Sequence, residues 1–225
     1  MSYPKPTPLF HITSIRNLEN ILNAGALIAK NILVRERIDH CDIAYADLQD
    51  RRSRVIVPLG AGGCLHDYVP FYFAPRSPML DAIRRGLVAG CNEPQENILH
   101  FVVEAESIAT ANVPFVFTNG HAIMQPIQFF NSLSDIDKVD WEIILEPPTI
   151  GGYAKYWQDN PFGSNPKWSD RKRRRQAEFL VYQRLSWQLI NGICTMTESQ
   201  ADQIRQILRR FNLNTPVYVE PKWYY

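Results

Sequence analysis

The chain has 225 residues, of which 45% are hydrophobic and 12% aromatic, and it carries 24 Lys and Arg against 23 Asp and Glu. This composition excludes a disordered chain, a collagen-like repeat and a coiled coil, and the formal net charge of +1 excludes a global field that attracts nucleic acid. No low-complexity linker divides the chain, so we expect a single domain over residues 1–225.

The N-terminal segment and the cysteines favour a cytoplasmic protein without a metal site. Residues 1–8 lack a charged-then-apolar signal pattern, and no stretch approaches the ~20 apolar residues that a membrane-spanning helix needs. The sequence contains no CxxC spacing, which argues against a zinc site and a disulfide framework and leaves four scattered thiols at Cys41, Cys64, Cys91 and Cys194.

The first third of the chain predicts a strand, two helices and two more strands. A short strand at 9–12 leads into a helix that is capped by Thr13 or Ser14 and stops at residues 23–25. A second helix is expected over 42–52. The remaining apolar runs of this part predict a strand at 54–57 and a buried, aromatic strand at 67–73.

The rest of the chain alternates irregularly between the two kinds of element. Ser77-Pro78 predicts the start of a helix that ends near Arg85. We also expect strands at 98–105, 113–118 and 216–220 and a helix near 198–211. The segment at 177–187 fits either a strand or a helix. Because a regular βαβ rhythm is missing, we expect a mixed α/β (α+β) fold.

Familiar cofactor motifs are missing from the sequence. Residues 60–63 read Gly-Ala-Gly-Gly but lack the third glycine of GxGxxG. The sequence also has no Walker, HExxH, GxSxG or EF-hand motif. Nucleotide-binding folds of the Rossmann and P-loop types are therefore disfavoured.

A run of basic residues ends abruptly at a carboxylate. Residues 171–175 read Arg-Lys-Arg-Arg-Arg, and Glu178 follows at the edge of an apolar segment. A charge run alone is more often a solvated face, but a carboxylate that enters a core is costly unless it is paired or used. If residues 176–181 are extended, Gln176 and Glu178 face the same cleft.

Three features together resemble one family. They are His11 with Asn20, the stretch LHDYVPFYFAPRSPML at 65–80, and RKRRRQAEFLV at 171–181. Each has an ordinary reading by itself, since a lone histidine in an apolar strand is more often a core residue. Their combination resembles the DarT family, the DNA ADP-ribosyltransferase toxins of DarT–DarG toxin–antitoxin systems, over nearly the whole chain.

The resemblance implies an ADP-ribosyltransferase-like fold with a central split β-sheet flanked by helices. It implies NAD as co-substrate, transfer of ADP-ribose to a thymine base in single-stranded DNA, and no metal. By the same resemblance, His11 and Asn20 hold NAD, and the nicotinamide side is lined by Tyr72, Met79 and Leu80. The catalytic groups would be Glu178 and either Arg51 or Arg52, which we favour over Arg54.

Residues 146–175 are expected to form an aromatic and basic substrate loop. Its prolines and glycines exclude long regular elements, and a long loop rich in rings is usually functional or packed as a lid. Rings offer stacking platforms for bases, and cations hold phosphates. The expected DNA contacts are Tyr153, Tyr156, Trp157, Trp168, Arg171, Lys172, Arg173, Arg174 and Arg175.

The chemistry fits these residue types. Breaking the bond between nicotinamide and ribose passes through an oxocarbenium-like state, which a carboxylate such as Glu178 stabilises. Thymine N3 is a poor nucleophile while protonated, and an arginine and the glutamate are both candidates to assist its deprotonation. A single strand presents the base without the cost of unpairing it.

Two other functions fit the sequence. One is a single-stranded nucleic-acid-binding module without catalysis, and the other is the same transferase acting on RNA or protein. Salt-sensitive binding without NAD dependence would favour the module. If the enzyme modifies DNA, the resemblance implies a DarG-like macrodomain antitoxin as its partner.

The net charge hides an uneven distribution. Residues 167–175 hold six Lys and Arg against one Asp, a local charge of +5, which leaves −4 on the other 216 residues. We therefore expect a positive strip directly before Glu178 that guides a strand to one cleft.

Overall fold

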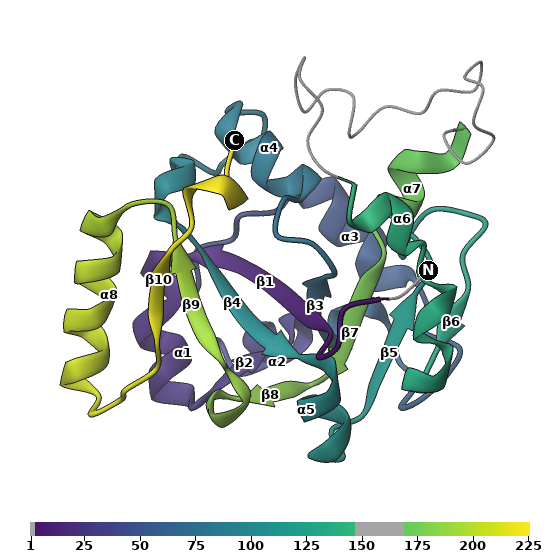
Figure 1. Ribbon diagram of the computed structural model, residues 1–225, viewed down its shortest axis with the longest axis horizontal. Helices are drawn as coiled ribbons and strands as arrows, with labels where there is room; N and C mark the ends of the chain where they lie inside the picture. The colour runs from purple at the N-terminus through teal and green to yellow at the C-terminus, as the bar shows by residue number, and fades with distance from the viewer. Residues whose placement is uncertain (1–2, 147–168) are drawn as a thin grey trace.

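The computed structural model describes residues 3–146 and 169–225 (Figure 1). A mixed sheet of eight strands runs through it, with one parallel pair, β9 and β10, among antiparallel neighbours. In spatial order, its strands are β10 (Val217–Val219), β9 (Gly192–Thr195), β4 (Ile98–Glu104), β1 (Pro8–Ser14), β3 (Tyr68–Tyr72), β7 (Glu178–Tyr182), β5 (Phe115–Thr118) and β6 (Phe129–Phe130).

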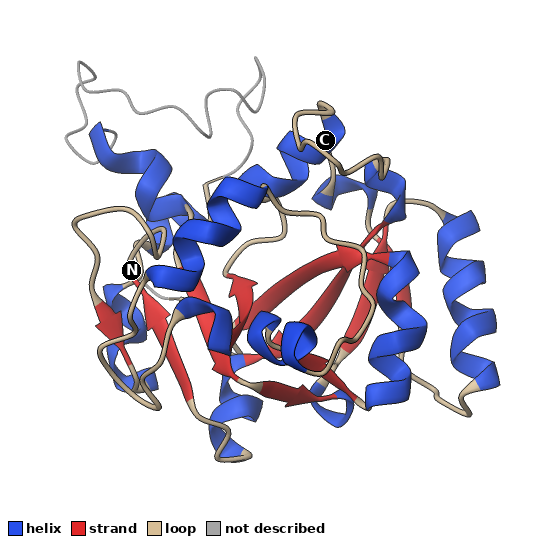
Figure 2. Ribbon diagram, turned by 180° about the vertical axis from the view of Figure 1, so that it is seen from behind, coloured by secondary structure: helices blue, strands red, loops and turns tan. Residues whose placement is uncertain are grey.

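Helices and a small second sheet surround the large sheet (Figure 2). The second sheet pairs β2 (Ala26–Ile28) with β8 (Arg184–Ser186). The helices are α1 (Leu18–Ala24), α2 (Lys30–Arg35), α3 (Ala46–Arg54), α4 (Pro78–Arg84), α5 (Ala105–Thr110), α6 (Trp141–Ile144), α7 (Arg171–Arg175) and α8 (Glu198–Arg210). The expectation of a mixed α/β fold with a large sheet flanked by helices is confirmed.

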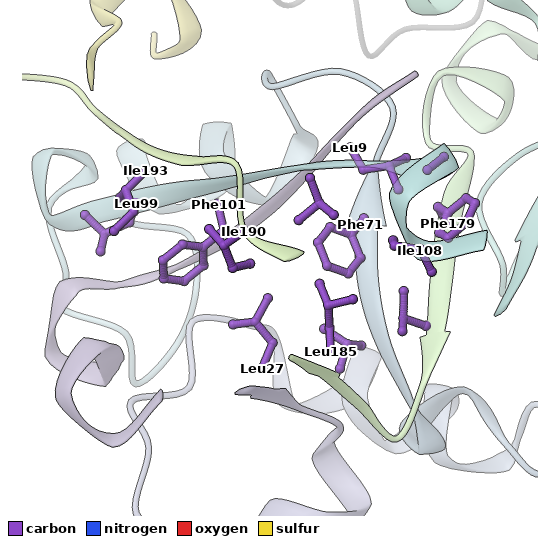
Figure 3. Packing of buried hydrophobic residues seen from close by; sticks show 14 of the residues in the cluster. Leu9, Leu27, Phe71, Leu99, Phe101, Ile108, Phe179, Leu185, Ile190 and Ile193 are labelled. Atoms are coloured by element: carbon purple, nitrogen blue, oxygen red, sulfur yellow. The ribbon is translucent and has the colours of Figure 1, made fainter. Parts of the chain in front are cut away.

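The main core lies against the central strands of the large sheet. Leu9, Phe71, Phe101 and Phe179 come from four adjacent strands, and each is fully buried or nearly so (Figure 3). Burying one such aromatic or aliphatic side chain stabilises the fold by about 1.5–3 kcal/mol. These strands therefore form the rigid part of the molecule from which the polar side chains described below project.

The first strand-to-helix unit forms as its sequence predicts. Ser14 ends β1, and its hydroxyl accepts a hydrogen bond from the backbone N–H of Arg16 at the start of a 3-10 turn. Gly25 ends α1 with φ of 62°, a left-handed conformation that glycine adopts without the steric penalty of a Cβ atom. Ser77 caps α4 in the same manner as Ser14, through a bond from Leu80 N–H.

Two expectations about the elements need correction or refinement. Residues 54–57 do not form a strand: Arg54 is the last residue of α3, and Ile56 makes only an isolated bridge to Cys64. The ambiguous segment 177–187 contains the strands β7 and β8, and Gln183 between them has φ of 59°. None of the helices in residues 3–146 and 169–225 has the length and apolar character to cross a membrane.

Candidate active site

A pocket lies beside β1, β3 and β7, and residues of α3 and of the loop at 36–45 also line it. Its wall includes His11 from β1, Tyr72 from β3 and Glu178 from β7. In the sheet, Tyr72 lies directly opposite Glu178, and β1 pairs with β3 through Phe10 and Tyr72. The pairing of three strands therefore brings together residues that lie more than 160 positions apart in the sequence.

Glu178 is the first residue of β7, and it is only 4% exposed. Its backbone N–H donates to the hydroxyl of Thr118, 3.1 Å away on the neighbouring strand. The helix α7 ends just before it, and its C-cap Gln176, with φ of −98° and ψ of 24°, is not extended. Gln176 and Glu178 still line the same pocket, so the expectation holds for their position although residue 176 is not extended.

Three groups surround the Glu178 carboxylate. The Arg52 guanidinium lies 2.8 Å from Oε2 and 3.1 Å from Oε1, the Ala122 backbone N–H donates to Oε1 at 3.1 Å, and the His121 Nδ1 atom lies 3.5 Å from Oε1. Burial alone would raise the pKa of Glu178, but the positive charge of Arg52 and the hydrogen bonds outweigh it and lower that pKa. Glu178 is therefore ionised at neutral pH.

The structure separates the candidate arginines. Arg52 is buried and contacts Glu178, whereas Arg51 on the same helix is exposed and Arg54 pairs with Asp50 at 2.8 Å. One guanidinium nitrogen of Arg52, Nη2, is buried without a hydrogen-bond partner in the described part of the chain. Of the two favoured arginines, Arg52 is the one placed to act on the carboxylate or on a ligand beside it.

His11 and Asn20 both line the pocket, in different environments. The Nδ1 atom of His11 donates to the Pro70 carbonyl at 2.8 Å, and burial lowers the pKa of this imidazole. The ring is thus neutral, with Nε2 as a hydrogen-bond acceptor. Asn20 is exposed and donates to the Asp39 carbonyl at 2.8 Å, so it also holds the loop at 36–45 that covers the pocket.

The residues expected at the nicotinamide side divide into two groups. Tyr72 and Met79 line the pocket. Burial and the nearby charge of Glu178 raise the pKa of Tyr72, so its phenol stays protonated. Leu80 is a correction: it is fully buried in a second core cluster with Ile12 and does not line the pocket, because α4 turns its side chain toward the sheet.

The positive strip expected before Glu178 is wrong for three of its side chains. Arg171, Arg173 and Arg175 are buried, 6–7% exposed, and because residues two positions apart lie on different sides of a helix, α7 is enclosed on more than one side. Arg171 pairs with Glu146 at 2.5 Å, and Arg173 pairs with Asp170 at 2.7 Å. The remaining members of this helix are Lys172, which is exposed, and Arg174, which pairs with Asp140 and Asp170.

The buried arginines support the turn that holds the glutamate. The Arg173 carbonyl accepts a hydrogen bond from the His121 N–H at 2.9 Å, and a β-carbon on Gly120 would lie 2.3 Å from Nη1 of Arg173. Arg175 donates to the Ile143 carbonyl of α6 at 2.5 Å. The role of the charge run is therefore at least partly structural. The expected stacking residues Tyr153, Tyr156, Trp157 and Trp168 lie outside the described residues.

Sequence reasoning missed His121, Ala122 and Thr118. All three follow or end β5, whose pairing with β7 brings them to Glu178. The signal in the sequence is weak: a histidine shortly after a predicted strand, next to a glycine. Burial lowers the pKa of His121, and the charges of Arg52, Arg51 and Lys172 lower it further against the opposing effect of Glu178, so its ring is neutral.

Similarity to known proteins decides the family. The family model for "ssDNA thymidine ADP-ribosyltransferase, DarT" matches residues 10–225. The chain belongs to the DarT family. Among the described residues, no group of three or more His, Cys, Asp or Glu is arranged to hold a metal ion.

Relatives in the DarT family match over the full chain. A DNA ADP-ribosyl transferase of Thermus sp. (strain 2.9) is 41% identical over 226 residues, which cover 100% of this chain and 99% of that protein. The solved structure of Thermus sp. 2.9 DarT with ADP-ribosylated ssDNA has a TM-score of 0.87 at 40% identity, with 100% and 99% of the two chains covered. The structure of the same protein with NAD+ has a TM-score of 0.83 at 38% identity, with full coverage of both chains.

One relative joins two activities in its name. A DNA ADP-ribosyl transferase–DNA ADP-ribosyl glycohydrolase fusion protein of Thermosipho africanus is 26% identical over 225 residues. The match covers 99% of this chain and 50% of the fusion protein. This chain therefore corresponds in length to about half of that protein.

Proposed function

We propose that this protein transfers ADP-ribose from NAD to a thymine base of single-stranded DNA and releases nicotinamide. The observation that carries the proposal is the buried, ionised carboxylate of Glu178, which Arg52 holds inside a pocket of a DarT-family chain. A buried charge is costly unless it is paired or used, and this one is paired while it lines a pocket.

Glu178 supplies negative charge where positive charge develops. In the proposed reaction, the bond between the ribose C1′ and the nicotinamide nitrogen breaks, and its electron pair leaves with nicotinamide. The thymine ring nitrogen then forms the new bond to C1′ and releases its proton to the solvent, so that the products are ADP-ribosylated thymine, nicotinamide and one proton. The ionised carboxylate, fixed by Arg52 and the Ala122 N–H, needs no reorganisation as the ribose becomes cationic.

Arg52 and His11 position the reactants. Arg52 uses Nη1 to hold the carboxylate, and its Nη2 is left to donate to a ligand. His11 is neutral, so its Nε2 accepts a hydrogen bond from a hydroxyl or amide group of NAD without adding positive charge beside the developing cation. Tyr72 and Met79 complete the wall beside Glu178 as a surface for the nicotinamide ring.

The proposal extends to a partner and a compartment. The modification of a cell's own DNA calls for a reversing activity, and the fusion protein of Thermosipho africanus joins a transferase to a DNA ADP-ribosyl glycohydrolase in one chain. A DarG-like macrodomain antitoxin is therefore the partner we propose for this toxin. The cytoplasm, where NAD and DNA are both available in bacteria, is the compartment that suits the reaction.

Mass spectrometry of the DNA tests this function. The protein is incubated with NAD and a pool of single-stranded oligonucleotides, with thymine-free strands and RNA strands of matched sequence as controls. We expect thymine-containing DNA to gain the mass of one ADP-ribose, with one nicotinamide released per adduct. A pool without any adduct, or an adduct only on the RNA or the protein, would overturn the proposal.

A further inference from the structure

Two exposed cations lie beside the pocket on different helices. Arg51 is in α3, next to Arg52, which lines the pocket. Lys172 is in α7, and its carbonyl accepts a hydrogen bond from the side chain of Gln176, another residue of the pocket wall, at 2.8 Å. Both views of the molecule place α3 and α7 toward the same edge (Figures 1 and 2).

Arg51 differs from the charged residues around it. Arg54 pairs with Asp50 on the same helix, and Arg174 pairs with Asp140. The side chain of Arg51 makes no hydrogen bond or ion pair with any residue in the ranges that the structure describes. An unpaired guanidinium beside a pocket is available to an anion, whereas a paired one must first leave its carboxylate.

The two cations also act on the same group at the pocket. His121 contacts Glu178, and the positive charges of Arg51 and Lys172 both disfavour protonation of its imidazole. The geometry also ties His121 to α7, because its backbone N–H donates to the carbonyl of Arg173, the residue after Lys172, at 2.9 Å. A polyanion that enters between α3 and α7 would therefore meet one cation from each helix.

We propose that Arg51 and Lys172 bind backbone phosphates of the acceptor strand next to the base that enters the pocket. The inference rests on the proposed function and names the residues that receive its second substrate. It replaces the expected strip of five cations by two, since Arg171, Arg173 and Arg175 are buried and already engaged. Arg51 is then a DNA-binding residue and Arg52 the residue that serves Glu178.

The salt dependence of DNA binding tests the assignment without any reaction. A fluorescent single-stranded oligonucleotide is titrated with protein in the absence of NAD, at salt concentrations from about 50 to about 200 mM. Each phosphate contact on a single strand contributes about 0.7 to the slope of log K against log salt. This slope is negative, and we expect Arg51→Gln and Lys172→Gln each to make it shallower by about 0.7. The double variant should make it shallower by about 1.4.

Matched controls carry the same change of charge elsewhere. Arg54→Gln removes an exposed, paired guanidinium from α3, and Arg209→Gln removes an exposed one from α8, on the other side of the molecule (Figure 1). Both should keep the slope of the unmodified protein. Thermal unfolding of every variant establishes that equal amounts of folded protein are compared.

The outcomes separate this inference from the proposed function. The paired assignment would be overturned if either Arg51→Gln or Lys172→Gln left the slope unchanged, or if the control variants changed the slope by the same amount. It would also be overturned if the unmodified protein did not bind the strand. If the unmodified protein labels thymine while the slopes stay constant, the function stands and the assignment fails. If the slopes fall as expected but no thymine is labelled, the assignment stands and the function fails.

Discussion

The arrangement of Arg52 and Glu178 shows how a single helical position decides a role. Successive residues of an α-helix point about 100° apart, so Arg51 and Arg52 cannot both face the sheet. Only Arg52 reaches the carboxylate, at 2.8 Å, while Arg51 faces solvent. The family resemblance suggests that one of these two neighbouring arginines is catalytic. Which of them faces the sheet depends on how the helix packs against it, and the local sequence does not contain that information.

Arg52→Gln is expected to leave the Glu178 carboxylate buried without its counter-charge. Breaking such a pair typically destabilises a protein by about 3–5 kcal/mol. In the folded protein the pKa of Glu178 lies below its usual value of 4.5. The ion pair therefore stabilises the fold above pH 4.5, and this stabilisation is lost as the pH falls below 4.5 toward the pKa of the folded protein. The difference in free energy of unfolding between the variant and the unmodified protein should therefore be largest near neutral pH and shrink below about pH 4.5.

Urea unfolding between neutral and acidic pH measures this deficit. Arg54→Gln, on the same helix but exposed, serves as the control and should unfold like the unmodified protein. A variant at Arg52 that is as stable as this control at neutral pH would show that the guanidinium does not compensate the buried carboxylate.

At the scale of elements, His100 joins β4 to the end of the chain. Its Nε2 donates to the Pro75 carbonyl at 3.0 Å, and its Nδ1 lies 3.2 Å from the Tyr224 hydroxyl. The ring is fully buried, and this burial lowers its pKa from 6.5 to about 4. The unfolded chain therefore binds a proton at a higher pH than the folded one, so acid favours unfolding.

The stability of the protein should fall as the pH drops from 6.5 toward about 4. This one histidine accounts for about 3 kcal/mol of the loss, from the difference between its two pKa values. In His100→Gln, which keeps hydrogen-bonding groups but does not titrate, the free energy of unfolding should decline less over that window. Parallel pH profiles of the variant and the unmodified protein would contradict the assignment.

Most elements could be predicted because their signals are local. Ser14 and Gly25 delimit the first helical segment, and Ser77 with Pro78 starts α4, through side chains that act within a few residues. The predicted strand at 54–57 does not form, because Arg54 continues α3 and an apolar run becomes a strand only when a partner strand lies beside it.

In the whole molecule, folding pairs the basic residues that are clustered in the sequence with carboxylates from other segments. The partners of the α7 arginines, Asp140 and Glu146, lie 34 and 25 positions before them, so a window of nine residues shows a strip that folding largely neutralises. Leu80 misleads for a related reason, since a residue inside a family-like stretch still belongs to the core when its helix turns it inward. The position of Glu178 in a pocket was predictable, because an acidic residue at the edge of a buried strand is costly unless it is paired or used.

One measurement tests the central claim that Glu178 carries the transfer of ADP-ribose to thymine. Equal amounts of folded protein, unmodified and Glu178→Gln, are incubated with NAD and a thymine-containing single strand, and the adduct is followed by mass spectrometry. Glu198→Gln, an exposed change in α8, is the control and should keep the normal rate. We expect Glu178→Gln to lower the rate by at least about 100-fold. Adduct formation at the normal rate by this variant would contradict the account.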